Sequence, residues 1–261
     1  MTPIQAQKRS LPFPGLLLTF VTLISLSLGA RAEPIVLQST ENQVALLELF
    51  TSEGCSSCPP AEKWLSSLKV APGLWKQFVP VAFHVDYWDY LGWRDPWASK
   101  AFSDRQRDYA QFWGGDSIYT PGFVLNGQEW RVWFRRKDGP PGSSTKAGVL
   151  IVSSADKAHW QVSFSPAAQN VTSYEVHAVL LANDLTSDVK AGENRGRRLN
   201  HDFVAIAQTA SSLKREGDKL ATEFKLPLTN KGDPKRLALA VWVTRLGSLE
   251  PLQSTGGWLP D

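Results

Sequence analysis

Two cysteines are the residues of this 261-residue chain most clearly suited to chemistry. Cys55 and Cys58 are its only cysteines, and two residues separate them. The largely apolar run from Ala45 to Phe50 predicts a buried strand, and Pro59 and Pro60 are typical of a first helical turn. At such a junction the two sulfurs can form a local disulfide, and helix N–H groups stabilise a thiolate. The pair therefore predicts thiol–disulfide chemistry.

Other interpretations of the pair remain open at this stage. A structural disulfide is one, although a bridge that closes so short a loop adds little loop entropy. A soft metal such as copper, bound by Cys55, Cys58 and His84, is another. A non-catalytic module that binds a partner is the third. Under the redox interpretation we expect no metal and no cofactor.

Further candidate residues lie in the last positions of a second predicted strand, Phe78 to Tyr87. A strand, a helix and a strand of these lengths form a right-handed parallel unit, so both strands end at the edge where open α/β sheets bind ligands. We expect His84 and Asp86 to lie beside the sulfurs there and to move protons during exchange. Glu53, two residues before Cys55, would raise the pKa of a nearby thiol if it were unpaired.

The rest of the chain suggests two folded parts. Asp95 followed by Pro96 predicts the start of a helix, and Asn126-Gly127 predicts a hairpin whose first strand begins near Thr120-Pro121. The segment 135–145 has the composition of a linker, and short alternating runs follow it. The expected fold is an α/β domain over residues 43–138 and a β-sandwich over residues 145–261.

The first 32 residues predict a signal peptide. Lys8 and Arg9 precede an apolar run that leads to Ala30-Arg31-Ala32, a typical cleavage site. The leader carries three basic residues and no acidic ones, so the remainder has 25 of each and its charge is no evidence for nucleic-acid binding. We expect a periplasmic or secreted protein that keeps no stable membrane anchor after cleavage.

Three longer segments resemble a known family. They are ELFTSEGCSSCPPA at 48–61, FHVDYWDYLGW at 83–93 and GENRGRRLNHD at 192–202. Together with Tyr119-Thr120-Pro121 and Asn126-Gly127 they resemble a family of secreted bacterial thioredoxin-like proteins, catalogued as domain of unknown function 1223. The resemblance covers nearly all of the chain after the leader, and it implies a thioredoxin-like N-terminal domain.

The resemblance also implies roles for individual residues. Cys55 would be the accessible attacking sulfur, Cys58 the buried resolving one, and Pro121 a cis-proline that faces the disulfide beside Thr120. The substrates would be protein or small-molecule thiols and disulfides. Residues 130–144 depart from the pattern, because a thioredoxin fold has a helix after the hairpin and none is predicted here. We interpret Arg197 and His201 as structural residues that hold a glycine-rich turn.

Overall fold

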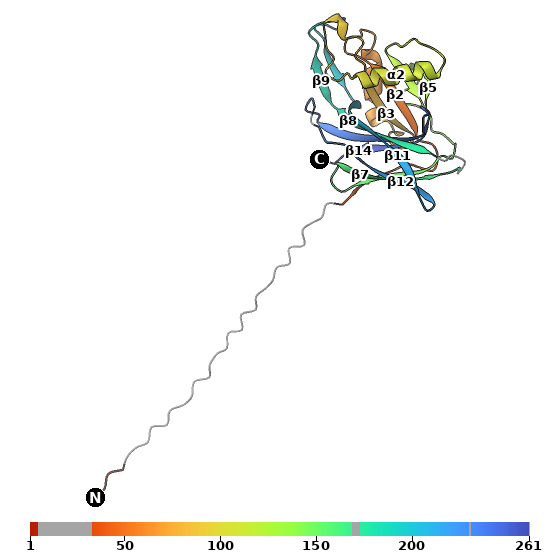
Figure 1. Cartoon of the computed structure of the whole chain (residues 1–261). Coiled ribbons are helices and arrows are strands. Elements are labelled where there is room, and N and C mark those ends of the chain that lie inside the picture. Colours follow the sequence, from red (N-terminus) through yellow and green to blue (C-terminus); the bar gives the residue numbers. More distant parts are fainter. Residues whose placement is uncertain (5–32, 169–172, 230, 261) are drawn as a thin grey trace. The chain divides into compact units, whose positions relative to one another are not determined.

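The computed structural model describes residues 1–4, 33–168, 173–229 and 231–260. The predicted leader lies outside the described residues from residue 5 to residue 32. Residues Glu33–Asp261 form one compact unit (Figure 1). Across the described ranges, no helix is both long and apolar enough to span a membrane.

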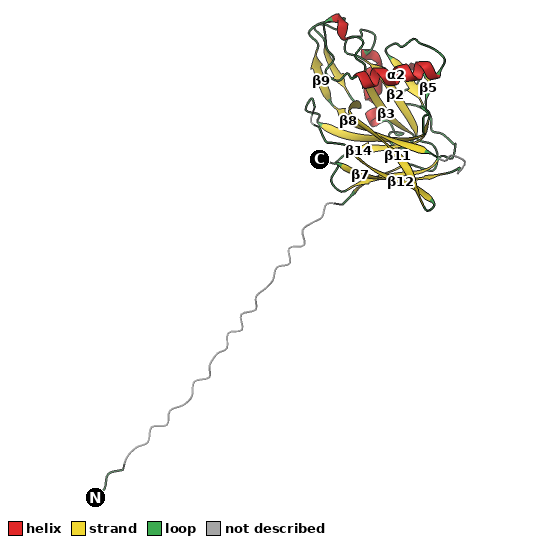
Figure 2. Ribbon diagram, viewed as in Figure 1, coloured by secondary structure: helices red, strands yellow, loops and turns green. Residues whose placement is uncertain are grey.

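Strands dominate this unit (Figure 2). In chain order they are β1 (Ile35–Gln38), β2 (Ala45–Thr51), β3 (Phe78–His84), β4 (Gly122–Leu125), β5 (Gln128–Glu129), β6 (Gly148–Ser154), β7 (His159–Pro166), β8 (Tyr174–Asn183), β9 (Leu185–Asp188), β10 (Arg198–His201), β11 (Val204–Glu216), β12 (Lys219–Lys225), β13 (Arg236–Arg245) and β14 (Pro251–Trp258). The helices are α1 (Pro59–Ser67) and α2 (Lys100–Phe112), with 3-10 turns η1 (Leu68–Val70), η2 (Asp89–Leu91) and η3 (Trp133–Arg135).

The predicted fold class, an α/β thioredoxin-like domain followed by a β-sandwich, is wrong. One mixed sheet of 12 strands takes strands from both halves of the chain, and β9 and β10 form a separate two-stranded sheet. Within the described ranges α1 and α2 are the only α-helices. The long strand β11 makes the sheet continuous, because it pairs with β12 near its C-terminal end, with β8 along most of its length and with β3 at Val204.

The strands that position the cysteines are β2 and β3. They are parallel and buried throughout, and Thr51 at the end of β2 is the register partner of His84 at the end of β3. The predicted parallel pairing is therefore confirmed. After β2 the chain turns into α1, where Pro59 and Pro60 occupy the first helical positions, whose N–H groups would have no intrahelical partner. Both strand ends thus lie at the edge that also carries the cysteines.

The second helix begins later than predicted. α2 starts at Lys100, and Ser99 is its N-cap, with a side chain that accepts a hydrogen bond from the N–H of Ala101. Asp95, the expected N-cap, is buried, with only 3% of its surface exposed, and its carboxylate bonds to His84. Because Asp95 does not cap the helix, the predicted start of the helix was wrong.

The hairpin after α2 is confirmed. β4 pairs antiparallel with β2 and with β5, and Asn126 and Gly127 both have positive φ in the turn between β4 and β5. The Thr120–Pro121 peptide bond is cis, as predicted. Along residues 130–147 the structure has the short turn η3 and no α-helix.

Two apolar clusters form most of the core. One surrounds β2, β3 and α1 and includes Phe50, Phe83 and Leu65. The other lies among the C-terminal strands and includes Trp160 and Phe164. Strands β8 and β13 contribute side chains to both clusters, with Leu181 and Ala240 in the first and Leu180 and Val241 in the second. Successive side chains of β8 and β13 point to opposite faces and enter different clusters. These two strands therefore join the cysteine-bearing region to the rest of the sheet.

Candidate functional site

The cysteines lie in the turn between β2 and α1. Cys55 and Cys58 form a disulfide with their Cα atoms 5.5 Å apart. Cys58 is the N-cap of α1, and its carbonyl oxygen accepts hydrogen bonds from the N–H groups of Ala61 and Glu62. The Sγ of Cys55 lies 3.3 Å from the hydroxyl of Ser57 and 3.7 Å from the carbonyl oxygen of Thr120. The residue before Pro121 therefore touches the disulfide.

The two cysteines do not differ in exposure as predicted. Cys55 is 1% exposed and Cys58 is 0% exposed. The loop between β9 and β10 covers Cys55, because the amide Nδ2 of Asn194 donates hydrogen bonds to the carbonyl oxygens of Glu53 and Cys55. Glu193 of the same loop accepts a hydrogen bond from the N–H of Ser56 at 2.9 Å. In this oxidised form both cysteines are buried.

A cavity of about 420 Å³ opens beside Pro121. Its walls are mainly aromatic, formed by Tyr119, Phe123, Trp130 and Trp133. Such walls can hold an apolar side chain or a peptide segment next to the residues that touch Cys55.

Beside the disulfide turn lies a buried cluster of charged and titratable side chains. Glu53 accepts hydrogen bonds from the indoles of Trp93 (2.7 Å) and Trp97 (3.1 Å) and from Nε2 of His201 (3.0 Å). Nδ1 of His201 lies 2.5 Å from Oε2 of Glu62. Glu53 is therefore fully partnered, so the condition under which it was expected to raise a thiol pKa is not met.

His84 belongs to the same cluster. Its Nδ1 donates to Oδ2 of Asp95 at 2.7 Å, and its ring meets the ring of His201 edge to face, with centroids 5.1 Å apart. Asp95 also accepts from the backbone N–H groups of Glu53 and Trp97. These bonds account for the burial of Asp95 and fix the orientation of the His84 ring.

The electrostatics of the cluster favour its ionised forms. Burial alone would raise the pKa values of Glu53 and Glu62, but His201 lowers both. Burial alone would lower the pKa of His201, but Glu62 and Glu53 raise it to about 10. In the same way, His84 outweighs burial and lowers the pKa of Asp95. The cluster thus holds a charged imidazolium between two carboxylates.

The remaining predicted residues have other surroundings. Asp86 accepts a hydrogen bond from the hydroxyl of Ser103 on α2 at 2.5 Å, and among the described contacts it touches neither sulfur. Thr120 accepts a bond from the indole of Trp88. Arg197 donates to Asn194 and so holds the turn as expected, whereas His201 belongs to the buried cluster rather than to the turn.

The comparisons with known proteins indicate a family and no activity. The family model described as "Protein of unknown function (DUF1223)" matches residues 46–244. A crystal structure from Agrobacterium tumefaciens has a TM-score of 0.56 and 24% identity, over 84% of this chain and 96% of that one. HBP35 of Porphyromonas gingivalis has a TM-score of 0.54 and 12% identity, over 85% of this chain and 76% of that one. No curated protein matches. At these identities the two structures share the fold alone, whereas the family match spans most of the sequence, and the chain belongs to the DUF1223 family of proteins of unknown function.

Proposed function

We propose that the Cys55–Cys58 disulfide exchanges with the thiols or disulfides of proteins or small molecules. The observation that carries the proposal is the position of the pair in the turn that begins α1, at the edge where β2 and β3 both end. A bridge between residues three positions apart adds little to stability through loop entropy. A mainly structural role therefore explains its position poorly.

The exchange balances in sulfur, protons and electrons. A substrate thiolate attacks Sγ of Cys55, the bond to Cys58 breaks, and Cys58 leaves as a thiolate. A second substrate thiolate then attacks the substrate sulfur of the mixed disulfide and releases Cys55. The substrate dithiol loses two electrons and two protons, which the cysteine pair gains. The reverse sequence reduces a substrate disulfide.

The surroundings support Cys55 as the sulfur that reacts with substrate. Cys58 is part of the first turn of α1, whereas Cys55 lies under the β9–β10 loop and beside Thr120. The hydroxyl of Ser57 is near enough to donate to a Cys55 thiolate. The aromatic cavity beside Pro121 offers room for the side chain of a substrate.

The test uses two single variants and oxidised glutathione. Cys58→Ser should form a mixed disulfide through Cys55 roughly tenfold faster than Cys55→Ser does through Cys58, because access and thiolate character set the rate. Mass spectrometry of the folded proteins measures both rates, and glutathione redox buffers give the reduction potential of the wild-type pair. A pair that dithiothreitol reduces only after unfolding, or a Cys58→Ser protein that forms no mixed disulfide, would contradict the proposal.

We also propose that the protein is exported, a location that permits disulfides. The support is the charged, apolar and small-residue pattern of residues 1–32. Mass spectrometry of the protein from its native host should give Glu33 as the first residue. Recovery from the membrane fraction with the leader intact would contradict this.

A further inference from the structure

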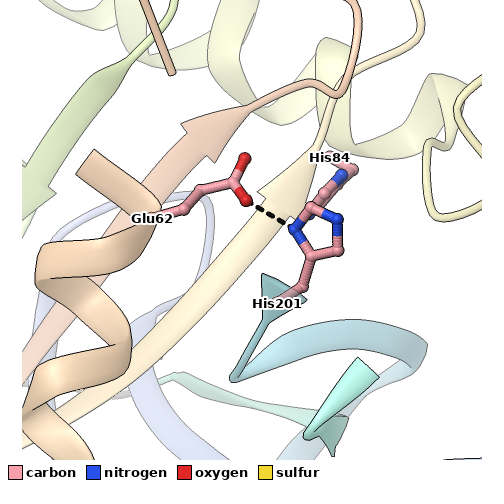
Figure 3. A group of neighbouring side chains, drawn as sticks. All are labelled: Glu62, His84 and His201. Atoms are coloured by element: carbon pink, nitrogen blue, oxygen red, sulfur yellow. Dashed lines mark hydrogen bonds and ion pairs between the residues drawn. The ribbon is translucent and has the colours of Figure 1, made fainter. Parts of the chain in front are cut away.

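We infer that Glu62, His84 and His201 bind one divalent transition-metal ion, with Zn²⁺ as the first candidate. The inference is independent of the exchange proposed for the cysteines. It uses side chains from three different elements: α1, the end of β3 and the end of β10 (Figure 3).

The three side chains converge. One carboxylate oxygen of Glu62 and one ring nitrogen from each histidine all lie within 4.8 Å of one another. Glu62 is 5% exposed, and His84 and His201 are each 1% exposed. Two imidazoles and one carboxylate form a known ligand set for zinc sites that keep a further position open. Small side-chain shifts would bring the three ligand atoms to one ion.

The hydrogen-bond partners of these three side chains resemble those of metal ligands in known sites. Metal-bound histidines usually donate their second ring N–H to a carboxylate or carbonyl. Here Asp95 accepts from Nδ1 of His84 and Glu53 bonds to Nε2 of His201, which leaves Nε2 of His84 and Nδ1 of His201 facing the group. The hydroxyl of Thr51 donates to Oε1 of Glu62 at 2.5 Å and fixes that carboxylate. All three candidate ligands are therefore held by an outer partner.

One atom of this cluster gives the independent sign of a missing ligand. Nε2 of His84 is buried and has no hydrogen-bond partner among the described residues. An ionised Asp95 can only accept, so Nδ1 of His84 carries the proton and, in the neutral ring, Nε2 presents a lone pair. A buried polar group without a partner destabilises the folded protein. A metal bond to Nε2 would remove that penalty.

The charges of the cluster point the same way. Glu53, Glu62 and Asp95 are three buried carboxylates, and among the described ion pairs their partners are His84 and His201 alone. No lysine or arginine pairs with them within the described part of the chain. Uncompensated buried charge is costly, and a divalent cation that replaces the proton between His201 and Glu62 would bring the cluster closer to neutrality.

The nature of the ligands distinguishes this site from a cysteine site. In the oxidised protein the two sulfurs are bonded to each other, and a cysteine binds metal tightly only as a free thiolate. A nitrogen and oxygen set suits Zn²⁺ and related divalent ions better than it suits soft Cu(I). The site should therefore load while the disulfide remains intact.

The first experiment measures zinc binding by the oxidised protein. After chelator treatment and dialysis against Zn²⁺, the wild type should retain one zinc per chain and melt at a higher temperature than the metal-free form. His84→Gln should bind at least about 100-fold more weakly, and Asp95→Asn about 10- to 100-fold more weakly. His177→Gln, which changes a histidine on β8, is the matched control and should bind like the wild type. A wild type that retains no zinc, or a His84→Gln protein that binds as tightly, would overturn the inference.

The second experiment needs no variant of the cluster and so does not depend on whether such variants fold. One equivalent of Co²⁺ in the oxidised wild type should give weak visible bands without a thiolate-to-cobalt charge-transfer band, and Cys55→Ser/Cys58→Ser should give the same spectrum. A thiolate band, a loss of binding in the double variant, or no cobalt-dependent band would overturn the inference.

Discussion

Two buried groups of charged side chains lie a few residues apart along β2, and they differ in whether their charges balance. The first joins Glu48 in the middle of β2 to α2. Arg105 donates through Nε to one oxygen of Glu48 at 2.6 Å, and the hydroxyl of Tyr109 donates to the other at 2.6 Å. The second group begins where β2 ends and contains Glu53, Glu62, Asp95, His84 and His201.

The charges of the Glu48 group balance. One negative and one positive charge face each other, and the guanidinium of Arg105 also lies over the rings of Phe83, Tyr109 and Trp242 at 5.1–5.6 Å. Burial alone would lower the pKa of Arg105, but Glu48 raises it further above its usual value. Such a group fastens α2 to the sheet.

The charges of the group at the strand end do not balance. It has an excess of carboxylates and a histidine nitrogen without a partner, and it lies next to the only disulfide of the described residues. The difference indicates how buried charge is used in this protein. Where the charges cancel and the buried carboxylate has a cationic partner, they serve stability. Where they do not, a ligand or a reaction is expected.

The strongest test of this contrast breaks the balanced group. Arg105→Met should lower the free energy of unfolding by about 3–5 kcal/mol, because it leaves the carboxylate of Glu48 buried without a counter-charge. Zinc binding and the glutathione exchange rate of the folded protein should stay unchanged. Urea denaturation followed by circular dichroism measures the first quantity.

The control for Arg105→Met is Arg107→Met, which changes the same residue type two positions later on α2 but at the surface. Arg107 pairs with Asp104 on the surface, and its side chain is 43% exposed. Its loss should cost less than about 1 kcal/mol, as for other exposed ion pairs. In addition, Glu48→Gln/Arg105→Met should recover part of the stability lost in Arg105→Met, because it removes both charges. Equal losses in Arg105→Met and Arg107→Met would remove the first half of the contrast.

A smaller effect is expected in the loop that covers the disulfide. Asn194→Ala removes the amide that donates to the carbonyl oxygens of Glu53 and Cys55. Because both oxygens lose a buried donor, the free energy of unfolding should fall by about 2 kcal/mol. Dithiothreitol should also reduce the disulfide of Asn194→Ala faster than that of the wild type, because the loosened loop exposes Cys55.

The matched control is Arg195→Ala, the next residue of the same loop, whose side chain is exposed. It should change neither stability nor the rate of reduction. If Asn194→Ala lowers stability but leaves the rate of reduction as it was, then the loop is scaffold, and access to Cys55 is controlled elsewhere.

The sequence predicted the strand-end region better than the fold. Local patterns indicated the cysteine junction, the parallel pair β2 and β3, and the Asn126-Gly127 hairpin, because each depends on a few neighbouring residues. The fold class was wrong because the linker-like segment 135–145 suggested a boundary, whereas β11 pairs with strands from both sides of it. Such long-range pairings leave no local pattern.

The same limit applies to the buried cluster. His84 was found because it ends a strand that must lie beside β2. Glu62 was missed and His201 was assigned to the glycine-rich turn, because their approach depends on how the β9–β10 hairpin packs against α1. Asp95 was taken for a helix cap. One signal was present: Glu62 falls next to the apolar positions of α1, where a carboxylate needs a buried partner.

The smallest predicted effect is a pH dependence that belongs to the balanced group. His177 stacks on Trp242, and the guanidinium of Arg105 also lies over the Trp242 ring. Burial, with Arg105 nearby, lowers the pKa of His177 from 6.5 to about 4. The unfolded chain therefore takes up a proton at a higher pH than the folded one. The contribution of the neutral His177 ring to the free energy of unfolding is complete above about pH 6.5. It is lost as the pH falls toward the pKa that His177 has in the folded protein.

The expected loss is about 1–2 kcal/mol between neutral pH and about pH 5, less than the full shift implies, because the carboxylate of Glu175 lies 3.4 Å from Nε2 of His177 and favours its protonation. His177→Gln removes the titrating ring and keeps a partner for the hydroxyl of Thr244, which now lies 3.1 Å from Nε2. Its stability should fall less over the same pH range, as urea denaturation at each pH would measure. Identical pH profiles for the two proteins would place the acid sensitivity in other groups, and the balanced group would then contribute no pH dependence of its own.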